Sequence, residues 1–139
     1  MNPDDYVSTH LRNLPDGLER EILKQLSFGN HYGNENACNR EKLLSMIRIF
    51  TKGLNKTSDR QMRVGIENLR NKGVRICNAV DGDGYFIAKT DEEYQQFRLK
   101  YGAYARSIFR TIKAMDEGKE VMDGEIIEPA ESIVQGSLF

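Results

Sequence analysis

Apolar residues recur every three or four positions in two segments of the first half of the chain. The first set follows the turn-like sequence 14–17 and predicts an amphipathic helix to about residue 27: Leu18, Ile22, Leu23 and Leu26. The second set begins after Asn39, a good helix N-cap, and predicts a helix that ends near Gly53: Leu43, Leu44, Ile47 and Phe50. Residues 28–39, between the two, are rich in Gly, Asn and His, and we expect a loop there.

A third helix is expected after a short turn at residues 54–57. Ser58 or Thr57 can cap its N-terminus, and Asp59 suits the positive end of its dipole. Its apolar positions predict one buried stripe, made of Met62, Ile66 and Leu69, before Gly73 ends the helix. A helix, a turn and a capped second helix form the helix-turn-helix pattern.

After Gly73 the pattern changes to the period of a β-strand. Val74, Ile76 and Asn78 alternate with Arg75 and Cys77. The Asp-Gly-Asp-Gly sequence at 81–84 then turns the chain into a second strand at 85–88. A hairpin directly after the third helix is the wing of a winged helix, and its strands close the core that three helices leave open. We therefore expect an α+β, mostly α-helical fold, a winged helix-turn-helix with a β-hairpin wing.

A long fourth helix is predicted to begin at the capping box Thr90–Glu93, in which Thr90 bonds forward and Glu93 bonds back. Its apolar positions recur at spacings of three and four: Tyr94, Phe97, Tyr101, Tyr104, Ile108, Ile112 and Met115. Such a face either packs on its own domain or pairs with a second copy, which would give a homodimer through residues 91–117. The pattern does not separate these alternatives.

Beyond Glu117 the composition becomes acidic, and Gly118, Gly124 and Pro129 oppose a stable helix. We expect a winged-helix DNA-binding domain with its C-terminal helix at residues 1–117. A flexible acidic tail is expected at 118–139, with 118–134 serving as a tether.

The charge is strongly polarised along the chain. Residues 36–115 hold 16 Lys/Arg and 8 Asp/Glu, a net charge of +8, whereas residues 1–35 carry 3 minus 6, or −3, and residues 116–139 carry 1 minus 7, or −6. A basic middle of this size can neutralise several phosphates, and an acidic tail is repelled by nucleic acid. The alternative is a solvated charged surface.

Side chains that can contact DNA gather on and around the third helix. Arg can bond guanine and Gln or Asn can bond adenine, whereas Lys56 and Arg75 are better placed for phosphates. The candidate DNA-binding residues are Lys56, Ser58, Arg60, Gln61, Arg63, Asn68, Arg70 and Arg75. The alternative is an exposed helix held by salt bridges. Asp81 and Asp83 at the wing tip have the wrong sign for phosphate, so we expect the tip to stand clear of DNA.

The stretches 58–63 and 69–73, followed by Ile76-Cys77 and 84–90, resemble small phage and prophage winged-helix replication-type proteins. The resemblance covers about half of the chain. It implies a winged-helix fold and double-stranded DNA binding linked to phage replication or its control. The second helix and the following turn, residues 44–57, are longer than that pattern.

The last five residues, Gln135-Gly136-Ser137-Leu138-Phe139, resemble the peptide of form Gln-x-(Ser/Asp)-Leu-Phe that binds the bacterial DNA polymerase sliding clamp. Leu138 and Phe139 can fill an apolar pocket while Gln135 bonds at its rim, and Ser137 matches the third specified position. A tether would let the peptide reach the clamp without moving the DNA-binding domain. The alternative is a tail that folds back on its own domain.

The sequence argues against an enzyme, because it has no phosphate-binding glycine loop, no paired His with acids and no metal-ligand spacing around Cys38 or Cys77. We expect no cofactor, no metal and no membrane span, and a cytoplasmic location in a bacterial host cell. A second functional hypothesis is an inhibitor that captures the host clamp or another host protein, with the winged helix as a protein-binding platform.

Overall fold

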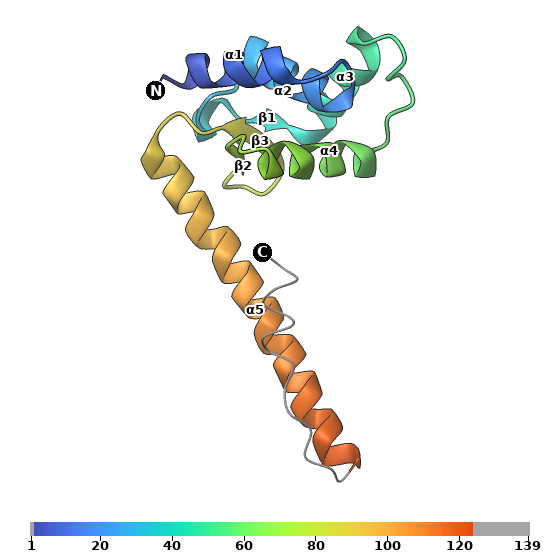
Figure 1. Ribbon diagram of the computed structural model, residues 1–139, viewed down its shortest axis with the longest axis vertical. Coiled ribbons are helices and arrows are strands. Elements are labelled where there is room, and N and C mark those ends of the chain that lie inside the picture. Colours follow the sequence, from blue (N-terminus) through green and yellow to red (C-terminus); the bar gives the residue numbers. More distant parts are fainter. Residues whose placement is uncertain (1, 124–139) are drawn as a thin grey trace. The chain divides into compact units, whose positions relative to one another are not determined.

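The computed structural model describes the backbone of residues 2–123 and the side chains of residues 2–118 (Figure 1). Two compact units divide the chain between Gln95 and Gln96. The first holds four helices and a small sheet, and the second is formed by the greater part of one long helix. The expected α+β class, mostly helical with a long C-terminal helix, is confirmed.

The chain opens with a helix that the sequence pattern did not predict, α1 (Pro3–Asn13). The Asn2 side chain caps it by accepting a hydrogen bond from the Asp4 backbone N–H at 3.0 Å, and Pro3 occupies its first turn. Tyr6 ties α1 to the end of α4 (Asp59–Asn71), because its hydroxyl donates to the Gly73 carbonyl at 2.8 Å. The predicted helix α2 (Leu18–Phe28) follows.

Helices α3 (Arg40–Phe50) and α4 form where the second and third helices were expected. Asn39 caps α3 by accepting from the backbone N–H of Glu41 and of Lys42, as predicted. Ser58 caps α4 in a full capping box with Gln61. The turn between the helices is fixed by Arg48, whose Nε donates to the Thr57 carbonyl at 2.7 Å.

The sheet has three antiparallel strands in the order β1-β3-β2: β1 (Cys38–Asn39), β2 (Ile76–Asn78) and β3 (Gly84–Ile87). The expectation of a plain loop over 28–39 is therefore wrong at its end, where β1 and a 3-10 turn (Asn34–Asn36) form. Strand β1 lies so close to β3 that a Cβ on Gly84 would clash with the Cys38 carbonyl oxygen.

The expected alternation in β2 is also not observed, since Ile76 and Cys77 are both buried.

The core is contributed by α1 to α4 and the sheet, which packs against both α2 and α4. The predicted stripe of α4 is confirmed, because Met62, Ile66 and Leu69 are at most 1% exposed. Helices α2 and α4 approach closely at Gly65, where an added Cβ would lie 2.7 Å from Ile22 Cδ1. The exposed side of α4 is thereby held in a fixed rotation.

Helix α5 (Asp91–Asp123) runs six residues beyond the expected end near 117, so 118–123 are helical rather than part of a tether. The tether residues 124–134 and the peptide 135–139 lie outside the described residues. The Thr90 hydroxyl accepts a hydrogen bond from the Glu93 backbone N–H, as expected, but the Glu93 carboxylate accepts from the backbone N–H of Lys89 and of Asn34 instead of Thr90. Within the described part of the chain, no helix combines the length and apolarity that a bilayer crossing requires.

Candidate nucleic-acid interface

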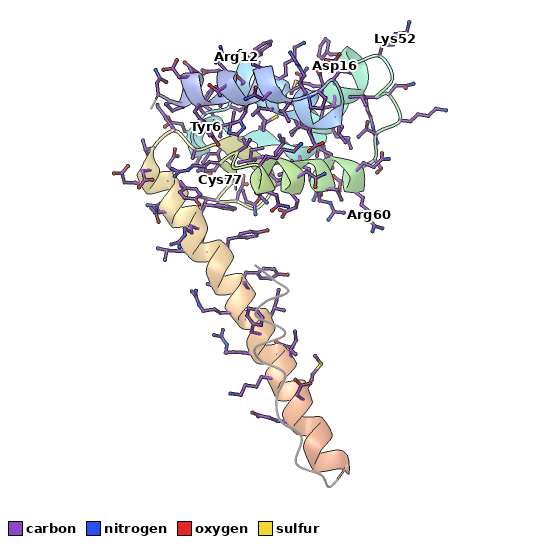
Figure 2. All side chains as sticks on the ribbon, in the orientation of Figure 1. Tyr6, Arg12, Asp16, Lys52, Arg60 and Cys77 are labelled. Atoms are coloured by element: carbon purple, nitrogen blue, oxygen red, sulfur yellow. The ribbon has the colours of Figure 1, made fainter. Side chains whose placement is uncertain are left out.

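The outer side of α4 presents cationic and amide side chains to solvent. Seven residues on it are exposed: Arg60, Gln61, Arg63, Val64, Glu67, Asn68 and Asn71. Figure 2 shows Arg60 pointing away from the body of the domain near the start of α4, and Lys52 doing so from the preceding turn. The inward stripe and this outward set occupy opposite sides of one helix, as the sequence predicted.

A groove of about 550 Å³ runs between α2, the α3–α4 turn and α4. Four of the candidate DNA-binding residues line it: Lys56, Arg60, Gln61 and Asn68. Leu18, Val64 and the small Gly65 form its apolar floor, and Glu19 is the one carboxylate among its lining residues. The fold therefore gathers two cations and two amides from the turn and the helix on one side of α4.

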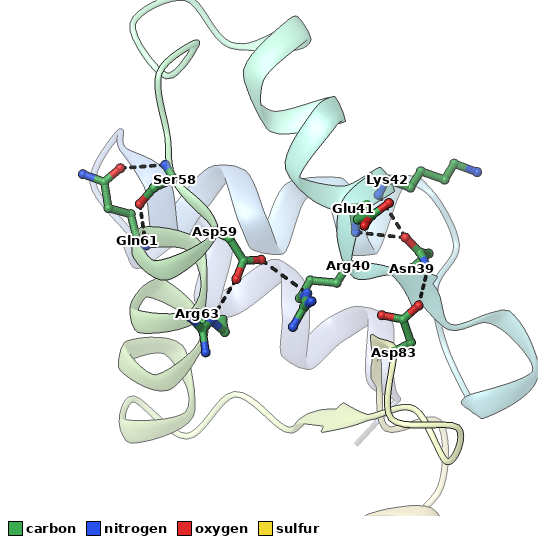
Figure 3. Close-up of polar contacts among 9 residues, drawn as sticks. All are labelled: Asn39, Arg40, Glu41, Lys42, Ser58, Asp59, Gln61, Arg63 and Asp83. Atoms are coloured by element: carbon green, nitrogen blue, oxygen red, sulfur yellow. Dashed lines mark hydrogen bonds and ion pairs between the residues drawn. The ribbon is translucent and has the colours of Figure 1, made fainter.

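Arg63 belongs to the other side of α4, where it forms an ion pair with Asp59 at 3.0 Å (Figure 3). Asp59 also lies 3.3 Å from Arg40 Nε at the start of α3, an ion pair without hydrogen-bond geometry. Both guanidinium groups remain about half exposed, so they can still reach an external anion. Tyr85 lies nearby; burial raises the pKa of its hydroxyl, while Arg70 and Arg40 oppose that shift.

Arg40 is the cation that sequence reasoning missed. It lies 19 positions before Asp59, so only the tertiary fold, in which α3 and α4 both pack on α2, brings the two together. Asp59 neutralises part of the local positive charge and holds two arginines from different helices in one place.

Ser58 and Gln61 have a structural role at the start of α4. Gln61 Oε1 accepts from the Ser58 backbone N–H at 2.8 Å, and the Ser58 hydroxyl accepts from the Gln61 backbone N–H at 3.1 Å. Gln61 Nε2 takes no part in this reciprocal pair. The amide group is thus held in position at the mouth of the groove.

Arg70 and Arg75 are engaged within the domain. Arg70 donates from Nε to the Ile76 carbonyl at 2.8 Å and from Nη2 to Asn78 Oδ1 at 2.9 Å, and only 14% of its side chain is exposed. Arg75 pairs with Asp91 at 3.1 Å and lies over the Tyr94 ring, 4.0 Å from its centroid. These contacts favour positioning roles over contact with DNA.

The acidic turn between β2 and β3 is bound to the start of α3. Asp83 accepts a hydrogen bond from the Asn39 side chain at 2.9 Å, and its backbone carbonyl accepts from the Arg40 N–H at 3.2 Å (Figure 3). Asp83 therefore makes hydrogen bonds within the domain, and they fix the β2–β3 turn beside Arg40.

The remaining chemistry of the described residues is limited. No group of three or more His, Cys, Asp or Glu side chains among them could hold a metal ion. Cys38 and Cys77 are free and buried, and burial raises the pKa of the Cys77 thiol to about 11. Both thiols are therefore protonated at neutral pH and poorly nucleophilic. The clamp-binding candidates Gln135, Ser137, Leu138 and Phe139 lie outside the described residues.

Comparison of the chain with protein-family models, curated proteins and solved structures found no match in any of the three.

Proposed function

We propose that the chain binds double-stranded DNA with α4, and that the first 95 residues are a winged helix. The order α2-β1-α3-α4-β2-β3 with the sheet order β1-β3-β2 supports that fold, because it places a hairpin directly after the second helix of the helix-turn-helix. The observation that carries the proposal is the outer side of α4, which joins exposed Arg and amide groups to a fixed helix start.

The chemistry of this surface suits a duplex. Arg60 and Arg63 can bond guanine edges or phosphates, and Gln61 and Asn68 match adenine in the major groove. Lys56 and Arg40 flank the helix and suit the phosphate backbone. The net charge of +8 over residues 36–115 adds sequence-independent attraction.

A matched pair of double variants tests the role of α4. Arg60→Ala with Arg63→Ala should lower DNA affinity and reduce the slope of log affinity against log salt by about 2, since each lost phosphate contact releases about 0.9 fewer counterions. Arg12→Ala with Lys24→Ala removes the same charge from exposed positions of α1 and α2. Figure 2 places Arg12 on the side of the domain opposite to Arg60. Equal losses in both variants would show that only net charge matters and would remove α4 from the interface.

We further propose that residues 135–139 bind a bacterial sliding clamp, which would link DNA binding to phage replication or its control. The support is the match of Gln135, Ser137, Leu138 and Phe139 to the clamp-binding pattern. The two activities would then reside in separate parts of one chain. Clamp binding by a chain that does not bind DNA would instead favour an inhibitor that captures the clamp.

A further inference from the structure

We propose that α5 pairs in antiparallel orientation with α5 of a second copy of the chain. The two-fold axis would cross the contact at the level of residue 107, midway along the paired segment. Six residues share the side of the helix that would form the contact: Arg98, Gly102, Ala105, Phe109, Ile112 and Asp116. Their spacing is 4, 3, 4, 3 and 4 residues, which is the same read in either direction. This spacing keeps all six on one face of an α-helix.

The charges at the two ends of this face are complementary only in the antiparallel orientation. Arg98 and Asp116 are 18 residues apart, which is five helical turns of 3.6 residues, so both lie on the same line along the helix. Reversing one helix about Ser107 brings Arg98 opposite Asp116 of the second copy, and this happens at both ends. A parallel pair would instead place Arg98 against Arg98 and Asp116 against Asp116.

The sizes of the inner four residues are complementary in the same register. Gly102 would face Ile112 of the second copy, and Ala105 would face Phe109. Each large side chain then meets a small one, so the two helices can approach closely without a clash. A parallel pair would set Phe109 against Phe109 and leave a gap at Gly102.

Aromatic side chains lie along one edge of this face. Phe97 and Tyr101 stack with ring centroids 5.2 Å apart, and Tyr101 is 44% exposed. Burying the exposed part of Tyr101 would add apolar area to a contact whose register is set by the charges and the side-chain sizes.

The first test is the mass of the full-length chain by sedimentation equilibrium, without DNA. We expect a dimer of twice the 15.9 kDa chain mass. Ala105→Asp should weaken the dimer at least roughly 100-fold, because two carboxylates would be buried beside the axis. Ser107→Asp adds the same charge two residues away on the opposite side of the helix and should leave the dimer intact. A monomer at every concentration, or equal effects of the two substitutions, would overturn the proposal.

Charge reversal tests the orientation. Arg98→Asp alone should weaken the dimer roughly tenfold, because it replaces two attractive contacts with two repulsive ones. Combining it with Asp116→Arg should restore wild-type affinity in an antiparallel pair and give no recovery in a parallel pair. Lack of recovery would overturn the antiparallel arrangement. Neither measurement depends on DNA, so failure of this proposal and failure of the DNA-binding proposal are separate results.

Discussion

Arg70 provides the sharpest test of how α4 is used. The sequence predicts that Arg70 contacts DNA, whereas its contacts in the structure hold α4 to β2. Its guanidinium joins α4 to β2 through the Ile76 carbonyl and the Asn78 side chain, and it pairs with Glu67 on α4 at 2.7 Å. Arg70→Ala removes all three contacts and leaves the Ile76 carbonyl without this donor. Arg60→Ala removes an exposed side chain of the same type from the same helix.

The expected cost of Arg70→Ala follows from those contacts. A hydrogen bond to a charged group contributes about 1.5–3 kcal/mol, and a stranded buried acceptor costs about 1–3 kcal/mol, with partial overlap between the two. We expect a loss of about 2–4 kcal/mol in the free energy of unfolding, against a total stability of roughly 5–15 kcal/mol. Arg60→Ala should change it by less than about 0.5 kcal/mol. The loss for Arg70→Lys should lie between those for Arg70→Ala and Arg60→Ala, since one ammonium cannot reproduce the forked contact of the guanidinium.

Urea unfolding followed by circular dichroism measures these differences. A loss of about 2–4 kcal/mol should lower the urea midpoint by roughly 1–2 M at an unchanged slope. In a DNA titration Arg70→Ala should keep the wild-type salt slope, whereas Arg60→Ala should reduce it by about 1. A folded Arg70→Ala variant with wild-type stability and a reduced salt slope would contradict the positioning role and return Arg70 to the DNA surface.

Three further predictions concern the core, the thiols and the tail. Ile66→Asp should unfold the domain, because a carboxylate at a position 1% exposed costs several kcal/mol; a folded variant by circular dichroism would show that α4 is rotated. Cys38 and Cys77 should resist thiol reagents until the domain unfolds. The free energy of unfolding should fall as pH rises from about 9 toward 11, because the unfolded chain loses the Cys77 proton at lower pH than the folded one. A Cys77→Ala variant with the same loss of stability at alkaline pH would show that another group causes it. A peptide of residues 131–139 should bind a bacterial sliding clamp in the micromolar range by calorimetry. Leu138→Ala with Phe139→Ala should abolish binding, and Gln135→Ala should weaken it less. No binding heat with several bacterial clamps would contradict the clamp hypothesis.

Much of the domain could be predicted because its signals are local. Asn39, Ser58 and Gln61 cap their helices through neighbours two or three residues away, and the stripe of α4 repeats within one helix. Helix α1 had comparable signals in Asn2 and Pro3, so its start could have been predicted, although only Tyr6, Val7 and Leu11 within it pack against the core.

The remaining features depend on contacts that no local pattern contains. Strand β1 is two residues long, and its pairing follows from the close approach that Gly84 permits. The bond of Arg70 to the Ile76 carbonyl requires the turn at Gly73 to bring β2 back along α4. The ion pair of Arg40 with Asp59 requires the tertiary fold to bring the starts of α3 and α4 together. Sequence reasoning therefore predicted which residues lie on the outer side of α4, but it could not separate the arginines that face outward from those that hold the domain together.

The salt dependence of DNA binding by the full-length chain tests the central claim most directly. Fluorescence anisotropy of a labelled duplex, repeated at several salt concentrations, gives the slope of log affinity against log salt. Four cations lie on or beside the outer side of α4, namely Arg40, Lys56, Arg60 and Arg63. At about 0.9 counterions for each phosphate contact, we expect a slope of about −3 to −4. Absence of binding at the lowest salt, or a slope near zero, would contradict DNA binding through α4.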